Sequence, residues 1–264
     1  MKILNFLFSR SKQEQDKPIR DKLKTRKDFE RVLAEDLDIM ETTKARMDTA
    51  KNINLYMYRS LSYSYILILQ SKYSVDAKID ELRDIYIKSM HYFLQAFNKR
   101  NPIYADILNY VSLGVLLNIP DDNFRQLIDY VKQMDKQAKP SGWTPDLLLW
   151  FMLNSRMKEQ EKQKYAETLA YPRLYNGLYK VIQAPNAAAA KDALSKYLDR
   201  WYNLNSNAPW YNSHLKDNSY RGYWAWEVAA VAKIMHIDDS DLKNNQYYPY
   251  DMVHWADNET TAKE

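Results

Sequence analysis

Glycine is scarce in this chain, and that scarcity restricts the folds open to it. Only four of the 264 residues are glycine and nine are proline, whereas an all-β chain of this length needs turn residues at every hairpin. Helices need far fewer, because one long element replaces several short strands and their turns. Hydrophobic residues make up 46% of the chain and charged residues 27%, the balance of a folded globular protein. We therefore predict an all-α protein.

Apolar residues recur at spacings of three, four and seven along much of the chain, as they do on the buried side of an amphipathic helix. With proline, asparagine and glycine as boundary signals, the pattern predicts helices over 28–50, 52–73, 76–97, 101–118, 120–138, 187–203 and 222–236, and more between 144 and 183. No repeat of about 20 to 50 residues stands out, so we expect an irregular bundle of about eight to ten helices.

Local residues refine several of these helices. The helix over 52–73 is apolar on more than one face, as a central helix would be. Ser74 or Asp76 is expected to cap the start of the next helix, and Asp251 is expected to cap a short terminal one. The helix over 222–236 is small and apolar on its buried side, so a neighbouring helix can approach it closely.

Charge and composition divide the chain into four parts. The first 31 residues carry ten Lys and Arg against five Asp and Glu, and residues 1–27 are expected to form a basic arm. The sequence Lys-Pro-Ser-Gly at 139–142 is the clearest linker signal of the interior. It separates an expected N-terminal helical domain at 28–138 from a C-terminal helical domain at 143–256, which a tail at 257–264 follows.

The expected cellular compartment rests on three features that the sequence lacks: cysteine, a signal peptide and a membrane-spanning stretch. There is no cysteine, which excludes disulfides and thiolate metal sites and fits a reducing environment. Arg10 and Lys12 follow the short apolar start where a signal peptide would have small cleavage-site residues. The longest apolar stretch, 103–119, contains polar residues and is shorter than the roughly 20 apolar residues of a membrane-spanning helix. We expect a cytoplasmic protein that does not contact a membrane.

The sequence offers no obvious catalytic set. Its four histidines, at 91, 214, 236 and 254, lie far apart and form no zinc-protease motif. Its glycines are isolated, so no glycine-rich phosphate-binding loop is present. We therefore expect a protein without enzymatic activity, bound metal or cofactor.

Two alternatives remain open at this point. A helical metal-dependent hydrolase would use His236, Asp238 and Asp239 as ligands, with Glu227 for acid–base work. The simpler interpretation of Glu227 is a structural one, in which its carboxylate accepts a hydrogen bond from a tryptophan N–H or a loop backbone. A nucleic-acid binder would stack bases on the dense aromatic residues of 201–226, but few Lys and Arg accompany them. Direct nucleic-acid binding is therefore not expected.

The C-terminal part of the sequence carries a family likeness. Its ordered blocks are Trp201-Tyr202, Trp210 to His214, Tyr220 to Ala230, Ile237 to Ser240 and Tyr247 to Val253. These blocks resemble the PoNi family, the cognate immunity proteins of polymorphic bacterial DNase toxins. The helices over 28–138 resemble the N-terminal half of that family in length, helical pattern and position. Several blocks are themselves typical of a scaffold, with turns, helix starts and closely packed small residues.

The resemblance implies an immunity protein that binds a toxin nuclease delivered between competing bacteria, for example by type VI secretion. It would keep the nuclease from cutting the DNA of the cell by stoichiometric binding. A nuclease needs a basic cleft for DNA, and residues from 204 onward carry nine Asp and Glu against five Lys and Arg. The expected partner contacts are Asp238, Asp239, Asp241, Tyr247 and Tyr248. The sequence does not indicate an oligomeric state.

Overall fold

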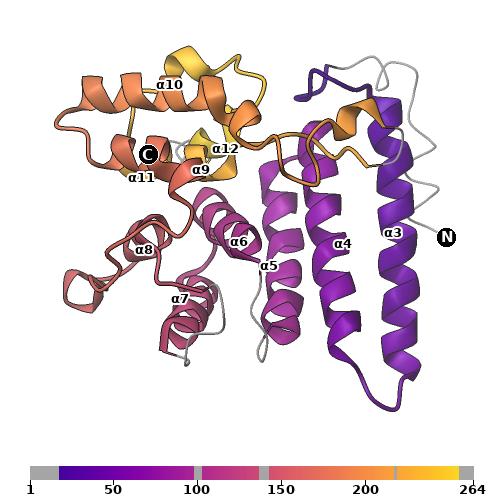
Figure 1. The fold of residues 1–264 in the computed structure, drawn as a ribbon. Coiled ribbons are helices and arrows are strands. Elements are labelled where there is room, and N and C mark those ends of the chain that lie inside the picture. The colour runs from indigo at the N-terminus through magenta and orange to yellow at the C-terminus, as the bar shows by residue number, and fades with distance from the viewer. Residues whose placement is uncertain (1–17, 98–102, 137–142, 217–218, 256–264) are drawn as a thin grey trace, which may run out of the picture. The chain divides into compact units, whose positions relative to one another are not determined.

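The computed structural model describes residues 18–97, 103–136, 143–216 and 219–255, and Figure 1 shows that helices dominate this part of the chain. Ten α-helices, α3 to α12, and three short 3-10 helices, η1 to η3, follow one another along it. Within the same residues there is no strand, and one parallel bridge joins Asp146 to Thr168. The predicted all-α fold and its approximate number of helices are confirmed.

The chain forms two compact units. Each unit consists of two separate stretches of sequence, because the chain leaves the first unit, returns to it once and leaves it again. The first unit holds α3 (Arg26–Thr49), α4 (Leu55–Ser74), α5 (Ile79–Ala96) and the returning segment Asn212–Tyr223 with η2 (Ser213–Leu215). The second unit holds α6 (Tyr104–Leu116), α7 (Asp121–Lys136), α8 (Leu147–Asn154), η1 (Glu159–Glu161), α9 (Pro172–Ile182), α10 (Ala187–Leu204), α11 (Trp226–Met235), η3 (Ser240–Leu242) and α12 (Tyr250–His254).

In the first unit, α4 lies between α3 and α5, which confirms its prediction as a central helix (Figure 1). A capping box starts α3, because the Thr25 side chain accepts the N–H of Asp28 while the Asp28 carboxylate accepts the N–H of Thr25. Between α3 and α4 lies a buried cluster of apolar side chains, which consists of Leu33, Met40, Leu61, Tyr65 and Ile68.

Buried polar contacts fix the returning segment to this unit. The Arg221 guanidinium donates to both carboxylate oxygens of Asp36 on α3, at 2.6 and 2.9 Å, and both side chains are buried. Tyr220 donates its hydroxyl to Asp21, and the Ser74 hydroxyl of α4 donates to the carbonyl of Arg221 at 3.0 Å. A segment that is distant in sequence therefore completes the polar interior of the first unit.

In the second unit, α11 packs against α6. Residues 226 to 232 of α11 are all buried, and three of them are alanines. Small side chains let the backbones of two helices approach closely, as the sequence predicts for this helix. Trp255, after α12, donates its indole N–H to the carbonyl of Leu116 at the end of α6. None of the described helices is both long enough and apolar enough to cross a membrane.

Gly177 marks a close contact between α9 and α10. A Cβ atom added at this position would lie 2.6 Å from Cδ2 of the buried Tyr197. Gly177→Ala is therefore expected to destabilise the protein, because overpacking costs about 1–3 kcal/mol and exceeds the gain of about 1 kcal/mol from alanine in a helix. Chemical denaturation measures the change. Asn176→Ala, at an exposed position of the same helix, is the matched control and should be neutral or slightly stabilising.

Several predicted helix starts are wrong. Ser74 lies at the end of α4, and α5 begins at Ile79 after Lys78, without a side-chain cap. The turn between them places Asp76 at a φ of 79°, in the left-handed region, which delays the next helix. Asp251 lies inside the first turn of α12, whose N-cap is Pro249. The predicted start at residues 101–102 lies outside the described residues.

The helix predicted over 222–236 is shorter than expected, because α11 begins only at Trp226. Gly222 has a φ of 108°, a conformation that a helix does not contain. At the other end the prediction is nearly right, since His236 follows the helix in a left-handed conformation that ends it.

The compact units divide the chain differently from the predicted domains. Contacts group α6 and α7 with the second unit, whereas the linker signal at 139–142 places them in the N-terminal domain. The physical reason is the packing of α6 against α11, which the local composition of a linker does not reveal. The linker residues 139–142, most of the arm 1–27 and the tail 257–264 lie outside the described residues.

Candidate functional site

The five predicted contact residues lie on the connection between α11 and α12. His236 ends α11 with a φ of 51°, and the N–H of Ile237 returns to the carbonyl of Ala232. The chain then forms η3 and continues to Tyr247 and Tyr248 before α12 begins. We call residues 238–241 the acidic loop.

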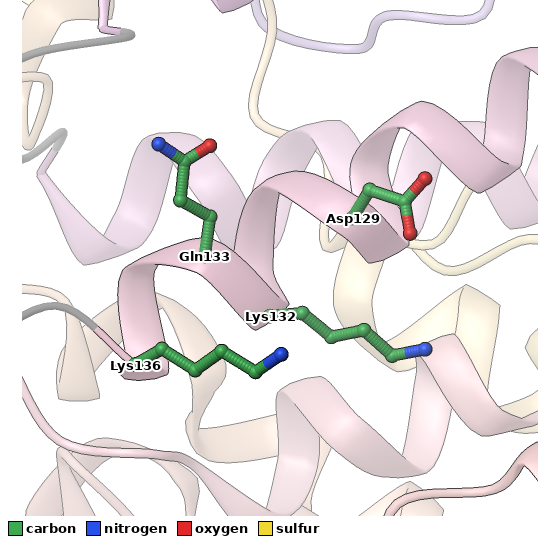
Figure 2. A pocket seen from close by; sticks show the side chains of 4 residues that line it. All are labelled: Asp129, Lys132, Gln133 and Lys136. Atoms are coloured by element: carbon green, nitrogen blue, oxygen red, sulfur yellow. The ribbon is translucent and has the colours of Figure 1, made fainter.

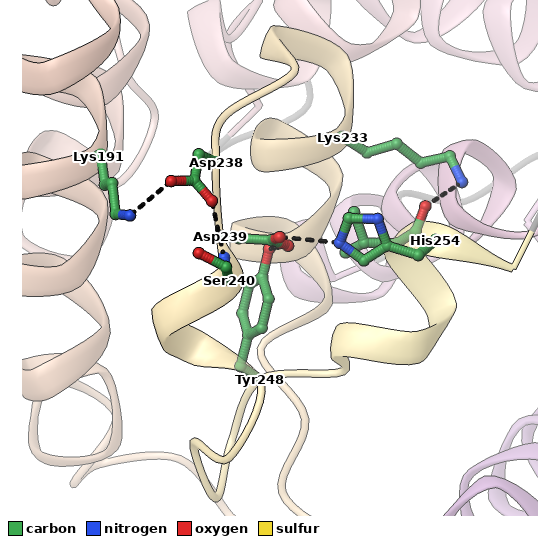
Figure 3. Close-up of polar contacts among 8 residues, drawn as sticks. Lys191, Lys233, Asp238, Asp239, Ser240, Tyr248 and His254 are labelled. Atoms are coloured by element: carbon green, nitrogen blue, oxygen red, sulfur yellow. Dashed lines mark hydrogen bonds and ion pairs between the residues drawn. The ribbon is translucent and has the colours of Figure 1, made fainter. Parts of the chain in front are cut away.

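Two carboxylates of the acidic loop face solvent and share one cation. Asp238 lies 2.7 Å from Nζ of Lys191 on α10 (Figure 3). Asp241 lies 2.8 Å from the same nitrogen. The hydrogen bond from Lys191, helped by Ser240, holds the pKa of Asp238 well below its usual range. The same two carboxylates raise the pKa of Lys191. The exposed loop therefore presents a net charge of about −1 rather than −2, so its attraction to a cation is weaker than the sequence suggests.

Asp239 has a different position, because its carboxylate is buried. It accepts the Tyr248 hydroxyl at 2.7 Å and lies 2.8 Å from Nε2 of His254 (Figure 3). Asp239 and Tyr248 are only 3% and 2% exposed. Through Tyr248 and His254, Asp239 ties the start of η3 to α12 and to the residues just before it, and supports the loop from inside. Direct contact with a partner requires exposed atoms instead.

Tyr247 belongs to a partly exposed group of aromatic rings, which we call the aromatic stack. Its ring stacks on Tyr202 at a centroid distance of 5.3 Å, and Tyr202 in turn stacks on Tyr211 at 4.5 Å. Trp210 stacks on the buried Trp201 at 5.4 Å. The stack thus joins the end of α10, the segment after it and Tyr247. It offers rigid aromatic surface with polar edges, which is common in protein interfaces.

Glu227 lies beneath this aromatic group and has a structural role. Its Oε1 accepts the indole N–H of Trp201 at 2.6 Å, as the simpler interpretation of the sequence predicts. The side chain is 6% exposed, and burial raises the pKa of its carboxyl to about 7, against the lowering effect of the Trp201 hydrogen bond. The carboxyl of Glu227 is therefore about half protonated at physiological pH.

The metal-dependent alternative finds no geometric support. No three His, Asp or Glu side chains gather as a possible metal site in the described part of the chain. The Glu227 carboxylate accepts a hydrogen bond from Trp201, and that of Asp239 is hydrogen-bonded to Tyr248 and His254. Asp238 pairs with Lys191. The expected ligands His236, Asp238 and Asp239 and the acid–base residue Glu227 do not form one site, because separate hydrogen bonds and an ion pair engage the three carboxylates.

A hollow on α7 gives no better candidate for a catalytic site. It is lined by Asp129, Lys132, Gln133 and Lys136, which Figure 2 shows along one helix. Binding sites for small molecules are usually enclosed and bring polar groups together from several elements. This hollow is open and formed by side chains of α7 alone.

Only part of this surface is predictable from the sequence. The aromatic residues at 201, 202, 210 and 211 stand out as a dense group in the sequence, but nothing there connects them with Tyr247. Lys191 lies 47 residues before Asp238 and has the appearance of an ordinary helix surface residue. Its pairing with two carboxylates depends on how η3 packs beside α10, and no local pattern indicates this.

These features define an all-α protein whose candidate site is an exposed acidic and aromatic surface. The N-terminal model of the PoNe immunity proteins (PoNi) matches residues 11–129, and their C-terminal model matches residues 144–252. The chain therefore belongs to the PoNi family of PoNe immunity proteins, as the resemblance in the sequence indicated. Residues 130–143 separate the two matches, whereas the compact units first divide between Arg100 and Asn101.

The fold is also similar to a solved structure. The crystal structure of protein PA2201 from Pseudomonas aeruginosa superposes with a TM-score of 0.72 at 18% sequence identity. The match covers 97% of this chain and 95% of that one, so the likeness extends to the whole fold. Comparison with curated proteins gives no match.

Proposed function

We propose that this protein neutralises a cognate PoNe-type DNase toxin by binding it stoichiometrically in the cytoplasm, without catalytic turnover. The observation that carries the proposal is the match of both family parts, which together extend over most of the chain. The toxin would arrive from a competing bacterium, for example by type VI secretion. Because the nuclease acts on DNA inside the cell, its inhibitor must meet it there.

The proposed contact surface consists of the acidic loop and the aromatic stack. Asp238, Asp241 and Tyr247 provide exposed atoms, and Asp239 and Tyr248 contribute by holding the loop in shape. A nuclease attracts DNA phosphates with basic residues, so a carboxylate surface steers its approach to the inhibitor. Aromatic rings that are already stacked lose little conformational entropy on binding, and they supply most of the expected binding energy.

Lys191 allows the electrostatic part of this proposal to be tested in both directions. Removing its charge with Lys191→Gln leaves two unneutralised carboxylates, and we expect association with the toxin to become about threefold faster at low salt. The double variant Asp238→Asn, Asp241→Asn removes two negative charges and should slow association by a larger factor, about tenfold. Both effects should shrink as salt rises. Stopped-flow or surface-plasmon kinetics with a catalytically inactive toxin measure these rates.

These substitutions lie at exposed or half-exposed positions, so the stability of the fold should change by less than about 0.5 kcal/mol. Asp84→Asn, at an exposed position of α5, removes one negative charge outside the loop and is the control for a charge change elsewhere on the protein. Equal association rates for both loop variants and the control would exclude the acidic loop from the encounter.

Co-expression tests the proposed function itself. The toxin encoded beside the gene for this protein is expressed in bacteria with and without it. We expect survival only in its presence and purification of the two proteins as a complex in equal amounts. Death of the cells despite a folded, expressed inhibitor would show that this toxin is not its target.

A further inference from the structure

One face of the helical hairpin formed by α3 and α4 exposes large apolar side chains. Ile39 on α3 is 50% exposed, and Tyr56 and Tyr63 on α4 are 77% and 63% exposed. The hydroxyls of Thr43 and Ser60 lie 3.4 Å apart and mark where the two helices meet on this side. Ile39 lies one turn from Thr43, and both tyrosines lie one turn from Ser60, so all belong to one side of the hairpin. We call this side the hairpin face.

Charged residues lie at opposite ends of the hairpin face. Glu35 precedes Ile39 by one turn, and Arg46 follows Thr43 by three residues, so both lie on the same stripe of α3. Both are exposed, and neither forms an ion pair with a described residue. They are separated by about 16 Å along the helix.

This arrangement is complementary to itself, and we propose that the hairpin face binds a second copy of this chain. A two-fold axis lying in the face, across the helices near residues 40 and 41, places α3 antiparallel to α3 of the partner. Glu35 of each copy then faces Arg46 of the other copy, so the charge pair forms twice. Ile39 and Tyr63 lie near the axis, so the partner copy covers their apolar surfaces at the centre of the interface.

The size of the face sets the expected strength of this dimer. Twelve residues of each helix span about 17 Å, and two packed helices about 20 Å in width, so the buried area is on the order of 1,000 Å² in total. Such an area is at the low end for specific interfaces. We therefore expect a reversible dimer with a dissociation constant in the micromolar range, roughly 1–100 µM. This dimer does not depend on the proposed function, because it requires no toxin.

Sedimentation velocity of the full-length protein from about 1 µM to about 300 µM tests the proposal. We expect the average mass to rise from that of the 31.4 kDa monomer toward twice that value. Glu35→Arg alone and Arg46→Glu alone should each weaken the dimer at least tenfold, because each creates two repulsive pairs. The double variant Glu35→Arg, Arg46→Glu should restore dimerisation. Asp84→Arg on α5 is the charge control and should leave it unchanged.

A monomer at every concentration would overturn the proposal, as would a dimer that the single variants do not weaken. Circular dichroism verifies that each variant is folded. If the wild type is monomeric and Glu35→Arg loses binding to the toxin, the face belongs to the toxin, and the dimer is again excluded. If the protein dimerises but does not protect cells in the co-expression test, the result contradicts the proposed function and leaves the dimer unaffected.

Discussion

Arg221→Met is expected to destabilise the first unit by about 3–5 kcal/mol, the usual cost of leaving one partner of a buried ion pair without the other. Asp36 is 3% exposed and receives two hydrogen bonds from the guanidinium. Without Arg221 its carboxylate has neither water nor a cation, and it must stay charged at high cost or take up a proton. The returning segment would also lose its strongest attachment to α3.

Urea denaturation followed by two probes measures this effect. All seven tryptophans lie in the second unit, so their fluorescence follows that unit, whereas circular dichroism follows both. We expect the dichroism transition of Arg221→Met to move to lower urea. The double variant Asp36→Leu, Arg221→Met should recover most of the loss, because no uncompensated charge remains. A single variant that costs less than about 1 kcal/mol would show that this pair does not hold the segment.

Glu227→Gln is expected to remove a large pH dependence of stability. The carboxyl of Glu227 has a pKa of about 7 in the folded protein, against 4.5 as its ordinary value, because burial disfavours its charge. Between these values the folded state binds more protons than the unfolded state. The free energy of unfolding therefore falls as pH rises from about 4.5 to about 7, by roughly 3 kcal/mol for this group.

Glutamine keeps an acceptor oxygen for the Trp201 indole and carries no charge. The variant should thus be more stable than the wild type at pH 8, and the difference between them should be small at pH 4.5. Other buried carboxyls, at Asp21 and Asp146, also have raised pKa values, but they are present in both proteins and cancel in the difference. Denaturation curves at several pH values give this difference directly. A difference that does not change with pH would contradict a raised pKa at Glu227.

The helices were predictable because their signals are local. Apolar spacing located α3 and α4 to within a few residues, and Asn186 caps α10 as a polar residue before an alanine-rich helix should. The errors arose where contacts that are distant in sequence decide the conformation. Gly222 and the residues before Trp226 stay outside α11, where Tyr220 and Arg221 bind side chains of α3 and the segment before it.

The candidate site was less predictable than the fold. The five predicted contact residues are distinguished in the sequence by charge and aromatic character, and those properties do not separate a supporting side chain from an exposed one. Nothing in the sequence distinguishes Asp239 from its neighbours Asp238 and Asp241. In the structure Asp239 is buried and forms two hydrogen bonds, so it supports the acidic loop from inside. The blocks that carry the family likeness include many buried residues, such as Trp226 and Glu227. They define the scaffold more than the contact surface.

The central claim is that this protein acts by stoichiometric binding to a nuclease. Its most direct test is a titration of purified toxin, at fixed concentration, with purified inhibitor, while DNA cleavage is followed. We predict a linear loss of cleavage that reaches zero at one inhibitor per toxin and persists when excess DNA is added. Full cleavage at a large excess of folded inhibitor, or complete inhibition at far less than one inhibitor per toxin, would contradict the claim.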